Sequence, residues 1–174
     1  EFPNKKLLFS EGCIEYSRFG MTRELQNAQM YAHDIIGNLN AGMNTFIDWN
    51  IVLVENGGPN HAGNYCEAPI ICNTIEGKLC KKLSYFYIAH FSKYIKPGAK
   101  RIATTQYSSQ VEVTAFINPD STTIVVLLNR TTEDLPIVLR LKDQLLKILL
   151  KKESISTIVI ISKTRREDGK SLKR

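Results

Sequence analysis

An amphipathic helix between two short apolar strands occupies the first 54 residues, and this order limits the fold more than any other feature of the sequence. The first strand is predicted at Leu7 to Phe9, and a β-branched and aromatic run from Thr45 to Val54 predicts the second. Between them, Thr22 is the expected N-cap of a helix that Gly42 ends. The apolar stripe of this helix comprises Leu25, Ala28, Ala32, Ile35, Ile36 and Leu39. A strand, a helix and a strand in this span predict a βαβ unit with parallel strands.

The rest of the chain first becomes rich in turns and then rich in short strands. The stretch from Glu55 to Lys82 predicts a long loop or a small β excursion. A second helix is expected from Tyr85 to Ile95, capped by Ser84 and stopped by Pro97-Gly98. Further strands are predicted at Ile102–Tyr107, Val111–Ile117, Thr122–Leu128, Leu135–Leu141 and Ile155–Ile161. Parallel α/β structure followed by antiparallel β structure implies two domains, and one βαβ unit with one further helix is too little to complete the first.

Composition and charge argue against several classes of protein. With 174 residues, of which 43% are apolar, the chain can bury one substantial core. The net charge is +6, but the stretch from Lys163 to Arg174 alone holds six basic and two acidic residues. This stretch is typical of a solvated tail, so nucleic-acid binding is not expected. The sequence contains no run of 18 apolar residues, so no transmembrane segment is expected.

The cysteines give no sign of a metal site. Cys13, Cys66, Cys72 and Cys80 form no C-x-x-C pair, so a zinc site is not expected. Four cysteines in a chain of this length do not require disulfides, and reduced, buried thiols are the expected state.

Polar side chains accompany both predicted parallel strands. Glu11 comes just after the first, and Asp48, Trp49 and Asn50 lie within the second. Barrel enzymes present catalytic groups at the carboxyl ends of buried parallel strands, although a carboxylate beside Gly12 is also an ordinary way to end a strand. Trp49, the only tryptophan, is compatible with a core position or with stacking on a sugar ring beside a carboxylate. Asp48 could equally cap the strand end.

The histidines and one glycosylation motif add weaker signals. His33 and His90 fall within predicted helices, where a partly buried or surface position is expected. His61 lies in the turn-rich stretch and could face a pocket, and Asn64 in the same stretch is a further candidate. Asn129-Arg130-Thr131 matches the glycosylation sequon, which matters only in a secretory protein.

Five stretches together resemble, in order, the carboxyl-terminal part of glycoside hydrolase family 30. They read LLFSEGC, NAQMYAHDIIGNLNAGMNTFIDWNIVLVENGGPN, GNYCEAPII, YFYIAHFSKYIKPGAKRI and AFINPDSTTIVVLLNRT. This is the family of lysosomal glucosylceramidase and its bacterial β-glycosidase relatives, and the resemblance covers roughly residues 7–162. The sequences GNLNAGMN and GGPNHAGN are more similar to those of the bacterial members.

The resemblance implies a retaining β-glycosidase on a (β/α)₈ TIM barrel with an attached antiparallel β-sandwich domain. Residues 1–54 would be the last βαβ unit of a barrel that is incomplete in this chain, and residues 55–82 a loop or small β excursion. Residues 83–97 would be the last barrel helix, residues 98–162 the β-sandwich domain and residues 163–174 a basic tail.

The resemblance also implies roles for individual residues. Glu11 matches the family nucleophile at the end of the seventh barrel strand, and Trp49 matches the tryptophan that lines the sugar pocket at the end of the eighth. Asn64 matches an asparagine near the sugar, and Cys13 a cysteine beside the nucleophile. Asp48 and His61 are the other residues expected at the substrate. No cofactor and no metal are implied, because two carboxyl groups suffice for retaining hydrolysis.

The main departure from the family is that the second carboxyl group is missing. The family uses a glutamate in an Asn-Glu pair after the fourth strand as its general acid and base, and no such pair occurs in this sequence. The matching region would lie upstream of Glu1 together with the first six strands, so the chain by itself is expected to be inactive or nearly so. His61-Ala62-Gly63 and Gly12 also differ from the lysosomal members, which leaves the aglycone open.

Several functions therefore remain open at this point. The resemblance favours the carboxyl-terminal part of a retaining β-glycosidase whose partner is a β-glucoside or glycolipid substrate, completed by the N-terminal half of the barrel. The alternative is a non-catalytic carbohydrate-binding or interaction module that works through the β-rich second half, and a gene remnant without function is a third possibility. The compartment is unassigned: cytoplasmic for a bacterial protein, lysosomal or secreted for a eukaryotic one.

Overall fold

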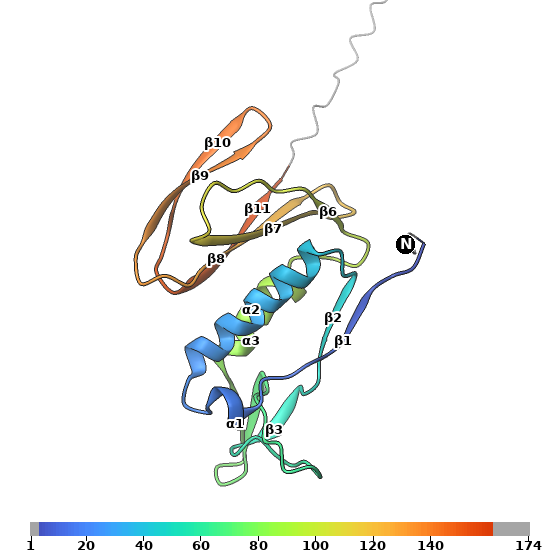
Figure 1. Cartoon of the computed structure of the whole chain (residues 1–174), viewed down its shortest axis with the longest axis vertical. Coiled ribbons are helices and arrows are strands. Elements are labelled where there is room, and N and C mark those ends of the chain that lie inside the picture. Colours follow the sequence, from blue (N-terminus) through green and yellow to red (C-terminus); the bar gives the residue numbers. More distant parts are fainter. Residues whose placement is uncertain (1–3, 162–174) are drawn as a thin grey trace, which may run out of the picture.

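The computed structural model describes residues 4–161, in which a pair of helices lies between a small parallel sheet and a larger antiparallel β unit (Figure 1). The predicted tail, residues 163–174, lies outside the described residues. The helices are α1 (Tyr16–Phe19), α2 (Glu24–Asn40) and α3 (Leu83–Ser92). The strands are β1 (Leu8–Gly12), β2 (Thr45–Asp48), β3 (Val52–Val54), β4 (Ile70–Asn73), β5 (Lys78–Lys81), β6 (Lys100–Ile102), β7 (Val111–Ile117), β8 (Thr123–Asn129), β9 (Leu135–Leu141), β10 (Gln144–Leu150) and β11 (Ser154–Ile160). None of the helices within residues 4–161 combines the length and the apolar character that crossing a membrane requires.

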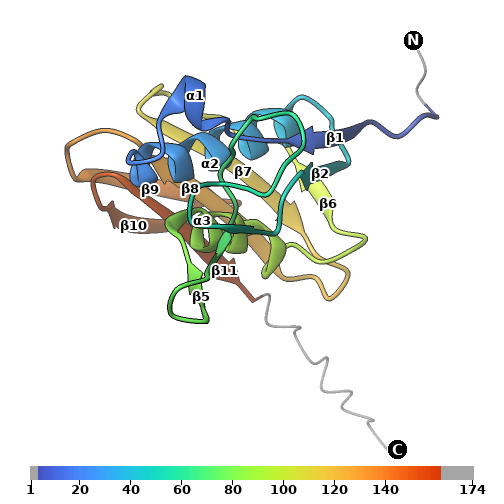
Figure 2. The same cartoon turned by 90° about the horizontal axis from the view of Figure 1, so that it is seen from below.

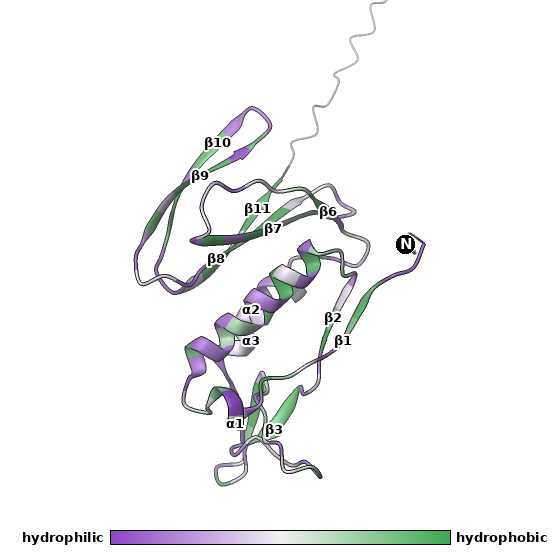
Figure 3. Cartoon of the chain, viewed as in Figure 1, coloured by the Kyte–Doolittle hydropathy of each residue, from purple (hydrophilic) through white to green (hydrophobic). Residues whose placement is uncertain are grey.

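The predicted βαβ unit is confirmed in its essential geometry. β1 and β2 pair in parallel, with Phe9 opposite Phe46, and α2 connects them. The rings of Phe9 and Phe46 stack with centroids 4.9 Å apart. A side chain at Gly12 would place its Cβ only 2.7 Å from the ring of Phe46, so the close packing of the two strands depends on glycine at this position. The amphipathic character of α2 is visible in its alternating purple and green colour (Figure 3).

The single strand expected from Thr45 to Val54 is wrong, because the chain bends after Asp48. The N–H group of Trp49 donates to the carbonyl of Gly12 at 2.8 Å and to Oδ1 of Asp48 at 3.0 Å. β3 then enters a different, three-stranded sheet, in which it pairs in parallel with β4, and β4 pairs antiparallel with β5. The turn between β4 and β5 projects from the body of the protein (Figure 2).

Both predicted helix caps are wrong. α2 begins after Arg23 rather than Thr22, and its start has no side-chain cap. α3 begins after Lys82, so Ser84 lies inside the helix, where its buried hydroxyl donates to Glu67 at 2.9 Å. The hydroxyl of Ser84 therefore satisfies a buried carboxylate rather than the free N–H groups at the start of the helix.

The larger β unit consists of a four-stranded antiparallel sheet and a separate hairpin. The sheet has the order β11-β8-β7-β6, and the hairpin is formed by β9 and β10. The strand expected at Ile102–Tyr107 is wrong, because β6 ends at Ile102. β10 was not expected, because its residues do not alternate cleanly between apolar and polar. The other predicted strands agree with the structure to within one residue at each end.

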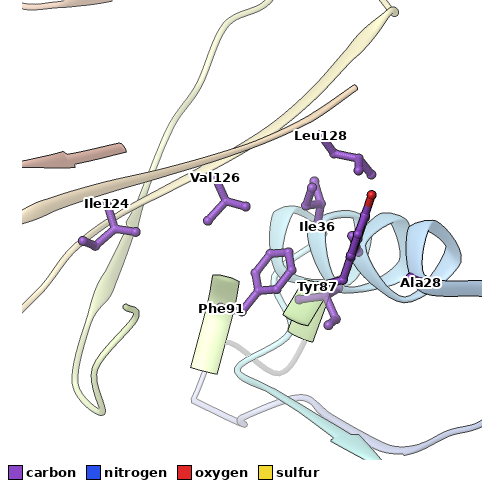
Figure 4. Packing of buried hydrophobic residues seen from close by; sticks show 9 residues of the cluster. Ala28, Ile36, Tyr87, Phe91, Ile124, Val126 and Leu128 are labelled. Atoms are coloured by element: carbon purple, nitrogen blue, oxygen red, sulfur yellow. The ribbon is translucent and has the colours of Figure 1, made fainter. Parts of the chain in front are cut away.

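β8 is buried at all seven positions and carries the core on both of its faces. Ile124, Val126 and Leu128 face α2 and α3, where they pack with side chains that include Ile36 and Phe91 (Figure 4). The intervening residues Val125 and Leu127 pack with Leu150 of β10 and with partly buried side chains of β9. A single strand therefore joins the helices to the hairpin. The apolar stripe predicted for α2 is confirmed, since Ala28, Ala32, Ile35 and Ile36 are all buried in this core and Leu25 and Leu39 pack against it.

Replacing Leu128 by alanine is expected to lower the free energy of unfolding by about 2–5 kcal/mol, because Leu128 is fully buried and its loss leaves a cavity between β8 and the helices. The matched control is Leu145→Ala, since Leu145 is 67% exposed, and its effect should stay below about 0.5 kcal/mol. Urea unfolding followed by circular dichroism measures both. Equal effects of the two substitutions would contradict the assignment of the core to β8.

Candidate functional site

Glu11 and Trp49 lie at the carboxyl ends of two neighbouring parallel strands. Glu11 is exposed at the end of β1, and Trp49 follows β2 with 61% of its surface exposed. The hydrogen bond from the Trp49 N–H to the Gly12 carbonyl, 2.8 Å long, fastens the two strand ends together. An exposed carboxylate and an exposed aromatic side chain thus lie at the same edge of the sheet, which is where barrel enzymes present their catalytic groups.

Asp48 lies half-buried beside this pair, and its pKa is far from its usual range. Its Oδ1 accepts hydrogen bonds from the hydroxyl of Tyr31 at 3.1 Å and from the Trp49 N–H, while Oδ2 is buried without a partner among residues 4–161. Burial raises the pKa of Asp48 to about 7, the two hydrogen bonds oppose that rise, and the charge of Glu67 adds to it. Asp48 therefore changes its charge near neutral pH.

Cys13 and Asn50 flank the same strand ends. The amide of Asn50 approaches Sγ of Cys13 at 3.9 Å. Cys13 is exposed, contrary to the expectation of buried thiols, yet partial burial raises the pKa of its thiol to about 12, with further contributions from Cys66, Asp48 and Glu11. This thiol is therefore neutral at physiological pH and is not a thiolate nucleophile.

The loop between β3 and β4 carries the other two predicted residues, His61 and Asn64, both of them exposed. The Cys66 thiol donates to the backbone carbonyl of Asn64 at 3.2 Å, which ties Asn64 to the segment near Cys13. No hydrogen bond among the described residues ties His61 to Glu11 or Trp49. The loop itself is closed by Gly57, where a Cβ would lie 2.6 Å from the Cys66 carbonyl.

Glu67 is a central residue that the sequence analysis did not identify. Its side chain is fully buried and accepts hydrogen bonds from the Tyr16 hydroxyl at 2.9 Å, from Nζ of Lys82 at 2.8 Å and from Ser84. Its N–H donates to the carbonyl of Ile14 at 2.8 Å, so it links the segment after β1 to the start of α3. The available signal was a glutamate set between small apolar residues in the run Cys66-Glu67-Ala68-Pro69.

The remaining polar motifs have structural roles. His33 contacts Glu112 at 2.6 Å and joins α2 to β7, and His90 contacts Thr157 at 2.8 Å and joins α3 to β11, as expected for helix histidines. Asn129 of the sequon is fully buried, and its amide donates to the carbonyls of Glu133 and Lys151, both at 2.9 Å. An amide engaged in this way is not available for glycosylation in the folded protein.

Family models match almost the whole chain. The glycosyl hydrolase family 30 TIM-barrel domain matches residues 1–95, and the glycosyl hydrolase family 30 beta sandwich domain matches residues 98–158. The chain therefore belongs to glycoside hydrolase family 30, and it consists of part of the TIM barrel followed by the β-sandwich, with no closed barrel within the described residues.

Individual relatives agree with this membership. Lysosomal acid glucosylceramidase of Mus musculus is 34% identical over 142 residues, which cover 79% of this chain and 28% of the mouse protein. Putative glucosylceramidase 4 of Caenorhabditis elegans is 35% identical over 134 residues, which cover 75% of this chain and 26% of the worm protein. The crystal structure of SrfJ from Salmonella typhimurium superposes with a TM-score of 0.87 at 35% identity, over 92% of this chain and 36% of SrfJ. The chain thus spans about a third or less of the length of these relatives.

Replacing Glu67 by alanine is expected to lower the free energy of unfolding by about 3–5 kcal/mol, because Lys82 would keep a largely buried charge without its partner. The control is Glu76→Ala, which breaks an exposed ion pair with Lys78 and should cost less than about 1 kcal/mol. Adding Lys82→Met to Glu67→Ala should recover part of the loss, since it removes the buried charge. Urea unfolding of the four proteins measures this, and a Glu67 effect as small as that of Glu76 would contradict the buried role.

Proposed function

We propose that this chain is the carboxyl-terminal part of a retaining β-glycosidase in which Glu11 is the nucleophile. The observation that carries the proposal is the exposure of Glu11 and Trp49 at the ends of two adjacent parallel strands joined by a hydrogen bond of 2.8 Å. Membership of family 30 supports it. On this proposal residues 1–54, 55–82 and 83–97 belong to the barrel and residues 98–162 to the sandwich.

In the proposed reaction the Glu11 carboxylate attacks the anomeric carbon and forms a glycosyl-enzyme. A second carboxyl group about 5–5.5 Å away protonates the departing oxygen and then activates the water that releases the sugar. We place that second group upstream, in the part of the barrel that the longer relatives have and this chain lacks. Trp49 stacks on the apolar face of the sugar ring, and Asn64, Cys13 and His61 line the sugar pocket.

The proposed substrates are β-glucosides, including glucosylceramide-like glycolipids. The support is that the matched mouse protein is a lysosomal acid glucosylceramidase and the matched worm protein a putative glucosylceramidase. A role in sphingolipid metabolism follows from this choice of substrate.

The alternative, a carbohydrate-binding module in the second half, finds less support. The large cavity of that half, about 690 Å³, lies between β7, β8 and β9. Its walls are mainly aliphatic, with Val113, Val125 and Ile137 among them. Sugar sites need aromatic faces beside their polar groups, and Tyr107 is the one aromatic side chain among the described residues that line this cavity.

In the whole protein with its upstream barrel strands, Glu11→Gln is expected to lower kcat for an aryl β-glucoside on the order of 10³-fold or more, because the covalent step loses its nucleophile. Sugar binding should survive, since the amide keeps the shape of the side chain. A mechanism-based β-glucosyl inactivator should label the peptide that contains Glu11, as judged by mass spectrometry. The control is Glu15→Gln, which removes a surface contact with Arg18 and should leave turnover unchanged. Labelling elsewhere, or an active Glu11→Gln variant, would overturn the assignment.

The 174-residue chain by itself is expected to hydrolyse the same substrate at least about 10²–10⁴-fold more slowly than the whole protein, because it lacks the general acid. Assays of both proteins side by side, at equal molar concentration, measure the difference. Rapid turnover by the short chain would show that its second carboxyl group lies within the 174 residues.

A further inference from the structure

Asp48 occupies the face of β2 that points toward the helices. Phe46 and Asp48 are two residues apart on the strand and so share one face, and Phe46 packs against the core formed by α2 and α3. The contact of Asp48 with Tyr31, a residue of α2 that is only 2% exposed, confirms this direction. The carboxylate therefore lies behind the strand end at which Glu11 and Trp49 are exposed.

Asp48 also contacts the backbone of Trp49. The Trp49 N–H is shared between the Gly12 carbonyl and Oδ1 of Asp48, and Oδ1 is held in turn by the Tyr31 hydroxyl. A chain of hydrogen bonds thus runs from the buried helix to the backbone of the residue that presents the aromatic face. Removing Asp48 takes away one of the two acceptors of the Trp49 N–H, and removing Tyr31 leaves Oδ1 of Asp48 without the donor that holds it in place.

We propose that Asp48 and Tyr31 form a positioning pair that fixes Trp49 at the sugar site, and that Asp48 does not contact the substrate itself. This inference rests on the proposed function of Trp49 and changes the role that the sequence suggested for Asp48. Tyr31 acquires a functional role that no motif in the sequence indicated.

The protonation state of Asp48 can be used to test this role, because the groups that surround it are known. Tyr31 faces it from α2, Cys13 and Glu11 lie on the segment at the end of β1, and Glu67 lies on the neighbouring loop. With a pKa of about 7, the carboxyl is protonated at mildly acidic pH, where it offers one acceptor and one donor as an asparagine does. Asp48→Asn therefore imitates the protonated form without a change of shape.

Kinetics of the whole protein test the positioning role. We expect Asp48→Ala and Tyr31→Phe each to raise KM for an aryl β-glucoside about tenfold while kcat changes less, since a displaced Trp49 weakens sugar binding. Asp48→Asn should keep KM within about threefold of wild type at pH 5, because its Oδ1 still accepts both hydrogen bonds. If Asp48 binds the sugar directly, Asp48→Asn will raise KM as much as Asp48→Ala does, and Tyr31→Phe will leave KM unchanged. That result would contradict the inference.

Fluorescence of the 174-residue chain tests the same pair without any activity. Trp49 is its only tryptophan, so its emission reports this strand end alone. We expect the emission to titrate with a midpoint near pH 7 in the wild type and in the His61→Gln control, which removes the histidine of the neighbouring loop, and to lose that transition in Asp48→Asn. A transition that persists in Asp48→Asn overturns the pairing, because it would then arise from another group. Because this measurement needs no turnover, it separates a failure of this inference from a failure of the proposed glycosidase function.

Discussion

The complete burial of β8 is the constraint on which the rest of the structure depends. A strand apolar on both sides must be covered twice, and the chain covers it with α2 and α3 on one face and with the β9–β10 hairpin on the other. The helices are thereby held against the sandwich, and Tyr31 of α2 donates to Asp48 at the end of β2. The position of Trp49 is thus connected to the sandwich core through α2, which packs against β8 and bonds Asp48 through Tyr31.

The geometry of the site follows from how a few donors are shared. One N–H, that of Trp49, joins two strand ends and the half-buried carboxylate of Asp48. Another, that of Glu67, joins the segment after β1 to the loop that carries Asn64. Buried carboxylates at such junctions are stable only when donors converge on them, and Glu67 receives three, one from Tyr16 of α1 and two from Lys82 and Ser84 at the start of α3. The exposed candidate residues are therefore supported from behind by the half-buried Asp48 and the fully buried Glu67.

The sequence alone predicts the features that depend on local pattern. The parallel pairing of β1 and β2, the buried stripe of α2 and most of the sandwich strands follow from periodicity and turn residues, and the structure agrees. Features that depend on distant partners were missed. The sequence around Ser84 predicts a helix cap, but its hydroxyl donates to Glu67 instead. The run through Asp48 predicts one strand, but the chain bends where the Trp49 N–H donates to the Gly12 carbonyl. Family resemblance proposes Glu11 and Trp49 as site residues, but only the fold shows that Asp48 faces the helices.

The shared core of α2, α3 and β8 bears on how the two family domains are inherited. The boundary between the matched domains falls at residues 96–97, yet Phe91 on one side of it and Ile124, Val126 and Leu128 on the other belong to one apolar cluster. A recombination event at this boundary would divide a single core and leave an apolar surface on each product. Exchange of the sandwich for an unrelated module is therefore selected against, and the barrel end and its sandwich are expected to pass together from one descendant gene to the next.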